Sequence, residues 1–256
     1  CIRDRLSLLG MMDAISSGTT SINDHYFFAD SVAKACETIG MRGFIGHTIM
    51  TEYGPWTGNE QINQAKSFNN NWKNSKTGHP IFAPHETSTV SPKVLKELSN
   101  YALENDLLTH IHLAQTQKEM EYIKSNFKTS PIKHAYNLGI LNEKVIAAHC
   151  NVIEDGDLEL LADSKAFPVF CPTTHGIAGK PMNTNFLSEL NVDWGIGTDC
   201  SGGNDDYDML EEMRTALVLN NSVAKKNFIK PKEVFRKASE ENIKRISGGV
   251  FSGKLS

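Results

Sequence analysis

Short apolar runs alternate with longer amphipathic segments along almost the whole chain. The short runs are six to eight residues long and rich in β-branched and aromatic residues, which favour strands. They predict strands at 19–24, 42–48, 80–85, 107–114, 144–150, 167–172 and 192–199. The longer segments repeat apolar residues at helical spacing. They predict helices at 1–18, 27–40, 59–74, 91–106, 116–127, 153–164, 184–190, 209–221 and 231–246.

This repeated strand–helix order predicts an α/β fold with a parallel sheet covered by helices. A (β/α)8 barrel has eight strands in roughly 250 residues, so we expect a barrel of this type that lacks its first strand. A doubly wound open sheet is the alternative, but the glycine-rich segment 201–208 does not have the glycine spacing of a phosphate-binding turn. No linker-like stretch divides the chain, and residues 1–256 are expected to form a single domain.

Composition narrows the function classes. The 256 residues carry a formal net charge of −4, which gives no electrostatic reason to expect a nucleic acid or an anionic membrane as partner. No run of about 18 apolar residues is present, so no membrane span is expected. The five cysteines are odd in number and lack CxxC spacing, which argues against a disulfide framework and against a thiolate zinc site. A cytoplasmic protein is expected.

Polar side chains interrupt the predicted strands near their carboxyl ends. A lone histidine in a strand is usually a core residue, but here several strand ends carry histidine or aspartate. In a barrel these ends meet at one mouth, where active sites of this fold are built. The residues are Asp24, His25, His47, His85, His112, His149 and Asp199. For His25, a pocket-lining role and a local cap or turn both remain open.

The stretch THIHLA at 109–114 carries two histidines on one face, because side chains alternate along a strand. His112 lies nearer the mouth, and His110 is expected to be a buried residue one layer deeper. Together with His149 and Asp199, His112 is expected to bind a metal ion. Neutral imidazoles and a carboxylate suit Zn²⁺ with one position open for water, and a nearby carboxylate can take the proton of that water.

Several motifs occur in an order and spacing that resemble the amidohydrolase superfamily. They are GTTSIND, FAPHETSTVSPKVLKELSNYA, HIHLAQTQKEM, VIAAHCNVIEDGDLELLADS, CPTTH and GIGTDCSGGNDDYDMLEEMR. The resemblance covers essentially the whole chain, and AAHC followed by GTD after the right strands is its most specific part. The nearest branch contains the cytosine, guanine and S-adenosylhomocysteine/methylthioadenosine deaminases and the triazine chlorohydrolases. It implies metal-dependent hydrolysis of C–N or C–Cl bonds in a small nucleobase-like or triazine-like heterocycle, by attack of metal-activated water.

The resemblance also implies roles for individual residues. His112 matches a metal ligand. His149 matches a histidine beside the metal that orients the attacking water, and we count it among the ligands as well. Asp199 matches the aspartate that contacts the metal and shuttles the proton. His85 matches a histidine that points at the substrate, and His175 of CPTTH is a further candidate substrate contact.

Gln115 departs from the family pattern HLxET, in which a glutamate protonates the ring nitrogen in many deaminases. An amide can form hydrogen bonds but cannot act as an acid. We retain Gln115 as a catalytic candidate. The substitution leaves hydrolysis of other leaving groups open beside deamination. Trp56, in the loop 52–58, is expected to pack against the following helix, with a lid over the site as the alternative.

Two parts of the family pattern have no match in these residues: the HxH pair at the end of the first strand and the small β-sandwich domain. The chain is therefore expected to be truncated at both ends relative to the family. The cofactor is expected to be Zn²⁺, alternatively Fe²⁺, and to be weakly bound or absent. A truncated, catalytically inactive remnant is the alternative function. Unpaired sheet edges favour a homo-oligomer.

Overall fold

The computed structural model describes residues 2–51, 59–180, 184, 187, 189–225 and 228–253. Trp56 and residues 185, 186 and 188 of the predicted helix at 184–190 lie outside the described residues. Within the described part of the chain, no helix is long and apolar enough to span a bilayer.

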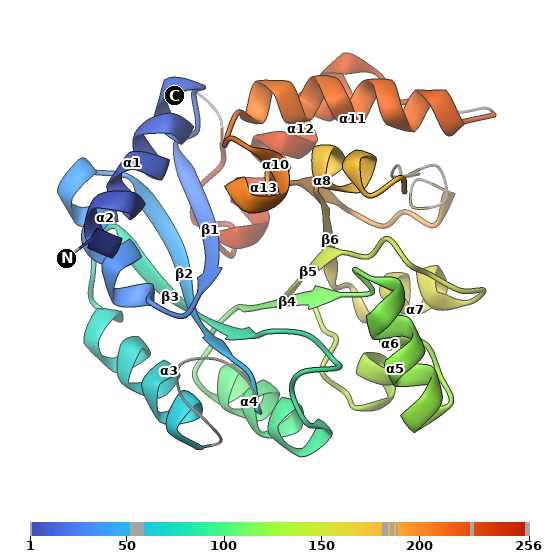
Figure 1. Ribbon diagram of the computed structural model, residues 1–256, viewed down its shortest axis with the longest axis horizontal. Coiled ribbons are helices and arrows are strands. Elements are labelled where there is room, and N and C mark those ends of the chain that lie inside the picture. The colour runs from blue at the N-terminus through green and yellow to red at the C-terminus, as the bar shows by residue number, and fades with distance from the viewer. Residues whose placement is uncertain are drawn as a thin grey trace.

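Seven strands form one parallel sheet in the order β1-β2-β3-β4-β5-β6-β7, which is their order in the chain. The sheet curls into a half-barrel with helices along its outside (Figure 1). The seven predicted strands and the barrel-type architecture are thereby confirmed. The strands are β1 (Ser21–Tyr26), β2 (Arg42–Ile49), β3 (Gly78–Pro84), β4 (Thr109–Leu113), β5 (Val145–His149), β6 (Phe167–Phe170) and β7 (Gly195–Ile196).

The helices follow the strands as the periodicity predicts, with some exceptions. They are α1 (Ile2–Ser16), α2 (Ala29–Ile39), α3 (Asn59–Trp72), α4 (Pro92–Glu104), α5 (Gln117–Phe127), α6 (Pro131–Asn137), α7 (Asp157–Ser164), α8 (Pro172–Ile177), α10 (Ser201–Asn204), α11 (Met209–Val223), α12 (Pro231–Ala238) and α13 (Glu240–Ile246). The sequence did not predict α6, α8 and α10, because about two turns or fewer show little periodicity. The helix predicted at 231–246 is interrupted at Ser239, which leaves the helical conformation with φ −122° and ψ −88°.

Alternation along β4 decides which side chains reach the interior. Ile111 and Leu113 are buried in the core cluster that they share with residues of α4, α6 and α7. His110 and His112 therefore face the inside of the half-barrel, as the sequence predicted. Phe44 of β2, Ile81 of β3 and Ile146 of β5 come earlier in their strands than the site residues. They form a separate apolar cluster with Ile246 of α13.

The same alternation corrects the expectation for His47. Ile45 and Ile49 of β2 are buried in clusters with residues of the outer helices, and His47 shares their face. Burial lowers the pKa of His47, and the carboxylate of Asp30, on α2, opposes this with a smaller effect. His47 therefore lies between the sheet and the helices and does not join the mouth.

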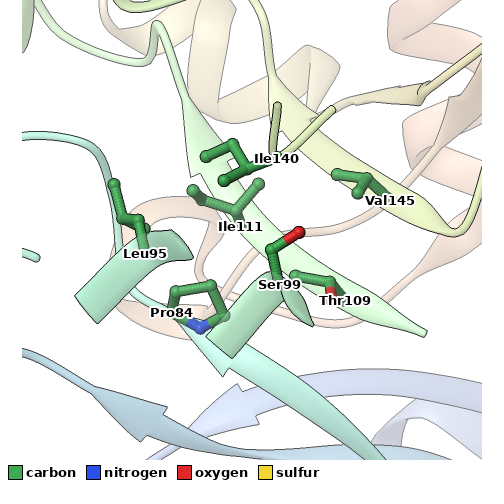
Figure 2. Close-up of a pocket in the computed structure, with 7 residues that line it drawn as sticks. All are labelled: Pro84, Leu95, Ser99, Thr109, Ile111, Ile140 and Val145. Atoms are coloured by element: carbon green, nitrogen blue, oxygen red, sulfur yellow. The ribbon is translucent and has the colours of Figure 1, made fainter. Parts of the chain in front are cut away.

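A small apolar crevice lies between α4 and strands β3, β4 and β5 (Figure 2). Only one residue pair, Phe82 with Thr109, joins β3 to β4 in regular register. The crevice is lined by Pro84, Leu95, Ser99, Thr109, Ile111, Ile140 and Val145. Its lining contains no titratable group, so we interpret it as a packing gap rather than a catalytic site.

Candidate active site

The curl of the sheet brings histidines from non-adjacent strands into contact. The ring of His25, at the end of β1, stacks on the ring of His112 of β4 with centroids 4.4 Å apart and an interplanar angle of 20°. The His85 ring lies 5.0 Å from the His112 ring, and the His149 ring lies 5.5 Å from the His112 ring. Three of the predicted site residues therefore converge at the carboxyl ends of the strands, and His25 belongs with them.

His112 is oriented by the backbone of the loop after β3. Its Nδ1 lies 3.1 Å from the carbonyl oxygen of His85, and its backbone N–H donates to the same oxygen at 2.9 Å. A carbonyl oxygen can only accept, so Nδ1 must carry the proton and Nε2 has a free lone pair. This is the arrangement that usually orients a metal-binding histidine.

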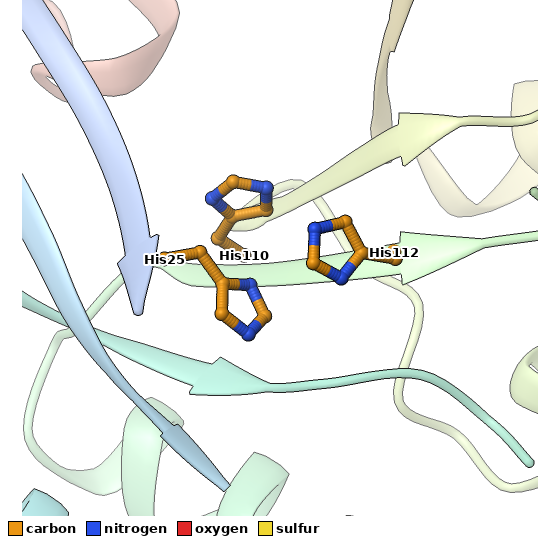
Figure 3. Close-up of side chains that lie close together, drawn as sticks. All are labelled: His25, His110 and His112. Atoms are coloured by element: carbon orange, nitrogen blue, oxygen red, sulfur yellow. The ribbon is translucent and has the colours of Figure 1, made fainter. Parts of the chain in front are cut away.

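His25, His110 and His112 form the first of two donor sets, which we call the three-histidine set (Figure 3). Each offers a ring nitrogen, and these atoms all lie within 4.8 Å of one another. The His25 and His110 rings are 4.9 Å apart and nearly perpendicular. His110 is buried, as expected, and its ring also lies beside those of His25 and His112.

His149, Cys171 and Asp199 form the second donor set, the mixed set, whose ligand atoms also lie within 4.8 Å of one another. Sequence reasoning missed Cys171, which carries no spacing signal. Burial raises the pKa of its thiol well above the ordinary value, so the free thiol is protonated and is a weak donor. The predicted ligands are therefore divided: His112 lies in one set, and His149 and Asp199 lie in the other.

Backbone strain marks the strand ends around the mixed set. His149 has φ 78°, Cys150 has φ 45° and Asp199 has φ 65°, and Ala114 after β4 has φ 50°. These left-handed conformations are uncommon outside glycine and are concentrated at functional sites, where the surrounding fold maintains them. Here they direct side chains at the carboxyl edge away from the regular alternation of a strand.

His175, in α8, contacts the mixed set through His149. Its Nε2 lies 3.2 Å from Nδ1 of His149, so one of the two imidazoles donates to the other. His175 is buried, and its Nδ1 has no hydrogen-bond partner. The predicted contact residue is thus adjacent to His149.

Burial keeps the site histidines neutral near pH 7. It lowers the pKa of His110 to about 4, and it lowers the pKa of His149 to about 3 with a smaller contribution from His175. Burial and the neighbouring histidines hold the pKa values of His25 and His112 well below the ordinary value. Neutral imidazole is the form that binds metal, so the donor chemistry of this edge fits a transition-metal ion.

Gln115 follows β4 and is held by a buried carboxylate that sequence reasoning missed. Its backbone N–H donates to Glu119 Oε2 at 2.9 Å, while the Thr87 hydroxyl donates to Glu119 Oε1 at 2.6 Å. Burial, followed by the charge of Glu86, raises the pKa of Glu119 to about 7. The T-x-x-E spacing from Thr116 to Glu119 is a helix-capping signal that could have identified this contact.

Glu212 of α11 is a second buried carboxylate, and it ties together two loops of the mixed set. It accepts from the Thr173 N–H at 3.1 Å and from Asn204 Nδ2 at 2.7 Å. Asn204 also donates to the carbonyl oxygen of Thr198, the residue before Asp199. Burial raises the pKa of Glu212 to about 7. A glutamate inside a helical pattern gives no sequence signal of such a role.

Asp24 does not reach either donor set. It alternates with His25 along β1, and its carboxylate acts instead on the thiol of Cys36 in α2. One carboxylate oxygen is buried without a hydrogen-bond partner, and burial raises the pKa of Asp24 to about 6. Asp24 thus faces the helical layer.

Comparison with known proteins places this edge in context. The chain is 34% identical over 222 residues to a 5-methylthioadenosine/S-adenosylhomocysteine deaminase of Thermoanaerobacter pseudethanolicus, covering 85% of this chain and 51% of the relative. It is 32% identical over 255 residues to a 5'-deoxyadenosine deaminase of Methanothrix thermoacetophila, covering 96% of this chain and 60% of the relative. The chain thus spans about half to three fifths of the length of these relatives.

Solved structures agree with the fold. A crystal structure of an adenosine deaminase from Xanthomonas campestris with bound zinc superposes with a TM-score of 0.93 at 25% identity, covering all of this chain and 59% of that one. A guanine deaminase from C. acetobutylicum, with guanine bound in its active site, gives a TM-score of 0.86 at 19% identity and shows a likeness of fold alone. The family model for the amidohydrolase family matches residues 6–247. The chain belongs to the amidohydrolase family.

Proposed function

We propose that this chain carries the barrel portion of a metal-dependent hydrolase that cleaves a C–N bond of a small nucleobase-like heterocycle. The observation that carries this proposal is the convergence of His85, His112, His149 and Asp199 at one edge of the curled sheet, in a chain of the amidohydrolase family. Deaminase relatives support the class of bond.

His112, His149 and Asp199 are the residues that we expect to hold the ion. The two imidazoles are neutral and the carboxylate is on the mouth side, which suits Zn²⁺ or Fe²⁺. When bound, such an ion lowers the pKa of a water toward about 7 and polarises it for attack.

Asp199 is the group that we expect to move the proton. Its Oδ1 accepts the Cys200 N–H at 2.7 Å, which orients the carboxylate and leaves Oδ2 for the proton. His149 is held by His175, so it can keep a fixed orientation beside the reacting water. The loops that carry Asp199 and His175 are joined through Glu212, which makes the mixed set one connected unit.

His85 and His175 are expected to contact the substrate. The His85 ring is bonded through Nδ1 to Thr89 at 2.9 Å and is partly exposed at the mouth. Gln115, on the adjacent loop, is expected to hydrogen-bond the heterocycle near the leaving group. Because its amide cannot supply a proton, a second candidate activity is hydrolysis of a C–Cl bond in a triazine-like substrate.

Product release tests the function directly. Ammonia release from 5'-methylthioadenosine and guanine, and chloride release from a chlorotriazine, should be measured after loading the chelator-treated chain with Zn²⁺ or Fe²⁺. Metal-dependent release of ammonia supports the proposed cleavage of a C–N bond. Release of chloride alone supports hydrolysis of a C–Cl bond. Metal-loaded protein with no turnover of any of these compounds would favour the inactive alternative.

We propose that the protein self-associates into a homo-oligomer. Light scattering after size-exclusion chromatography measures this directly. A cytoplasmic location remains a prediction from the composition.

A further inference from the structure

Two loops at the mouth carry residues that we expect to contact the heterocycle. His85 lies in the loop after β3, which ends at Pro84, and Gln115 lies in the loop after β4, which ends at Leu113. Because both residues lie beyond the regular strands, contacts between the loops determine how the two side chains are placed relative to each other.

One buried carboxylate joins these loops. Glu119, in the first turn of α5, is 1% exposed. Its Oε1 accepts the hydroxyl of Thr87 at 2.6 Å, and its Oε2 accepts the backbone N–H of Gln115 at 2.9 Å. Thr87 is also buried and lies two residues after His85. Each oxygen of the carboxylate therefore holds a different loop.

In the loop after β3, Glu119 is bonded within the turn that orients His85. The His85 ring is bonded through Nδ1 to the hydroxyl of Thr89 at 2.9 Å, and the Thr89 N–H donates to the carbonyl of Glu86 at 3.3 Å. Thr87 lies between these two residues in the chain. The bond from Thr87 to Glu119 therefore restrains the turn on which the His85 ring depends.

In the loop after β4, the peptide group between Ala114 and Gln115 is held at both ends. Its oxygen accepts the N–H groups of Asn151 and Val152, in the loop after β5, at 3.0 and 2.7 Å. Its N–H donates to Glu119. Ala114 has a left-handed φ of 50°, which turns the chain away from the strand at this point. The plane of this peptide sets the direction in which the Gln115 side chain leaves the backbone.

Helix capping alone does not explain this arrangement. In a capping box the carboxylate bonds the backbone N–H of the cap residue, which is Thr116 for α5. Here the carboxylate bonds the N–H of the preceding residue and a hydroxyl from another loop. Burial is also unfavourable for a charged group, and it raises the pKa of Glu119 to about 7. An exposed glutamate would cap the helix without this penalty.

We propose that Glu119 is a positioning residue that sets His85 and Gln115 relative to each other for recognition of the heterocycle. This inference rests on the proposed function and adds to it a residue that is too deeply buried to touch the substrate. Glu119 acts through the two loops. Misplacement of a contact residue by about 1 Å can lower the rate by about 100-fold, so such a link affects catalysis without contributing to the chemistry.

Steady-state kinetics of three variants test this role in the metal-loaded chain, with whichever of 5'-methylthioadenosine, guanine and a chlorotriazine the wild type hydrolyses. Glu119→Ala should lower kcat/KM at least about 10-fold, chiefly through a higher KM. Thr87→Val removes only the hydroxyl and should lower kcat/KM about 3-fold or more. Glu119→Gln should stay near the wild type, because its amide oxygen accepts the Gln115 N–H while its amide nitrogen donates to the Thr87 hydroxyl.

Asp157→Ala is the matched control, because Asp157 is also a carboxylate with 1% exposure that accepts one hydroxyl and one backbone N–H. Its partners are Ser130, before α6, and Glu154, before α7. This variant should lower the Tm about as much as Glu119→Ala and keep KM within about 2-fold of the wild type, because a loss of folded molecules lowers only the apparent kcat.

Two results would overturn the proposal. One is a wild-type KM in both Glu119→Ala and Thr87→Val, and the other is an equal rise of KM in Asp157→Ala. If Glu119→Ala does not fold, Thr87→Val decides, since it keeps the carboxylate and the shape of the side chain.

Failure of the proposed function would look different, because the wild type would then hydrolyse none of these compounds. Amide hydrogen exchange would still test the link between the loops. Thr87→Val should speed exchange at residues 85–89 and also at 114–116. Faster exchange at 85–89 alone would show that the loops are not coupled, and the positioning role would fall. Turnover by the wild type with unchanged KM in the variants would leave the hydrolase and remove the positioning role.

Discussion

The three-histidine set and the mixed set lie side by side, but the fold constructs them differently. His25, His110 and His112 project from regular strands, so the hydrogen-bond ladders of the sheet determine where they lie. The mixed set uses strand-end and loop residues, and two of its members have left-handed backbones. The strands therefore position one set, whereas loop contacts such as those of Glu212 hold the other.

The two sets also differ in the ligand atoms that they contain. The three-histidine set holds only ring nitrogens, and burial keeps these imidazoles neutral near pH 7 by lowering their pKa values. The mixed set contains a carboxylate, a thiol and an imidazole, and its carboxylate can exchange a proton with solvent at the mouth. We expect proton transfer to depend on the mixed set, because only this set contains a carboxylate.

The largest expected effect comes from removing the charge of Asp199. Asp199→Asn should lower kcat/KM by at least about 100-fold, because an amide cannot take the proton in the hydrolytic step. Asparagine tolerates the left-handed backbone at φ 65°, so the fold should persist. Steady-state kinetics measure the loss, and Co²⁺ titration should show weaker ion binding, because Asp199 is one of the proposed ligands.

Asp205→Asn is the matched control for this change. Asp205 is exposed and also has a positive φ of 71°. Its variant should keep full turnover. Equal activity of Asp199→Asn and wild type would remove the distinction between the two sets, because the mixed set would then have no part in proton transfer.

Lowering the pH tests a feature that both sets share, their buried neutral imidazoles. A histidine with a lowered folded pKa binds protons more readily when unfolded, so its contribution to stability is present above pH 6.5 and is lost as the pH falls toward its folded value. The pKa values of His47 and His110 are lowered to about 4 by burial. Glu119 and Glu212, raised to about 7, act in the opposite sense, since their contribution is lost as the pH rises from 4.5 through 7.

Asp24 and Asp157 also have raised pKa values and act in the same sense as the two glutamates. The histidines with lowered pKa values still outnumber these four acids, so the free energy of unfolding should fall between pH 6.5 and pH 4.5. Each strongly shifted histidine should contribute about 2–3 kcal/mol to this fall. Urea unfolding in EDTA at both pH values measures it. His47→Gln alters neither donor set, and it should reduce this fall by the contribution of one histidine. Stability that stays constant or rises on acidification would contradict the prediction.

A smaller effect is expected from the network that supports only the mixed set. In Glu212→Gln one carboxylate oxygen becomes an amide donor that faces the Thr173 N–H or the Asn204 amide. One hydrogen bond is lost and a buried donor is left unpaired, so the free energy of unfolding should fall by about 1–3 kcal/mol. Turnover should fall as well, because Glu212 joins the loops that carry Asp199 and His175.

Urea unfolding measures the loss of stability, and steady-state kinetics of the same preparation measure the loss of turnover. The control is Glu211→Gln, because Glu211 is the exposed neighbour of Glu212 and should change stability by less than about 0.5 kcal/mol. If Glu212→Gln kept the stability and turnover of the wild type, Glu212 would have no part in holding the mixed set.

Much of the architecture could be predicted because its signals are local. Period-2 alternation in THIHLA placed His110 and His112 on the interior face, and β-branched runs located the strands to within a few residues. The short helices α6, α8 and α10 escaped detection, since they contain too few turns to show a period. The same alternation, applied to β2, would have placed His47 on the outer face.

The site was less predictable than the strands. His25 had no clear role in the sequence because its partner, His112, is 87 positions away and on a non-adjacent strand. Cys171 had no spacing signal, and Glu212 resembled any other helical glutamate. Each of these residues acquires its role from a neighbour that the chain brings near only after folding.

Residue order alone accounts for the alternation of strands and helices, the family, and the collection of histidines and an aspartate at strand ends. The curvature of the sheet decided the rest. It set His25 against His112 and divided the donors into two groups, because distances between non-adjacent strands depend on how tightly the sheet coils, and that is a property of the packed whole rather than of any segment.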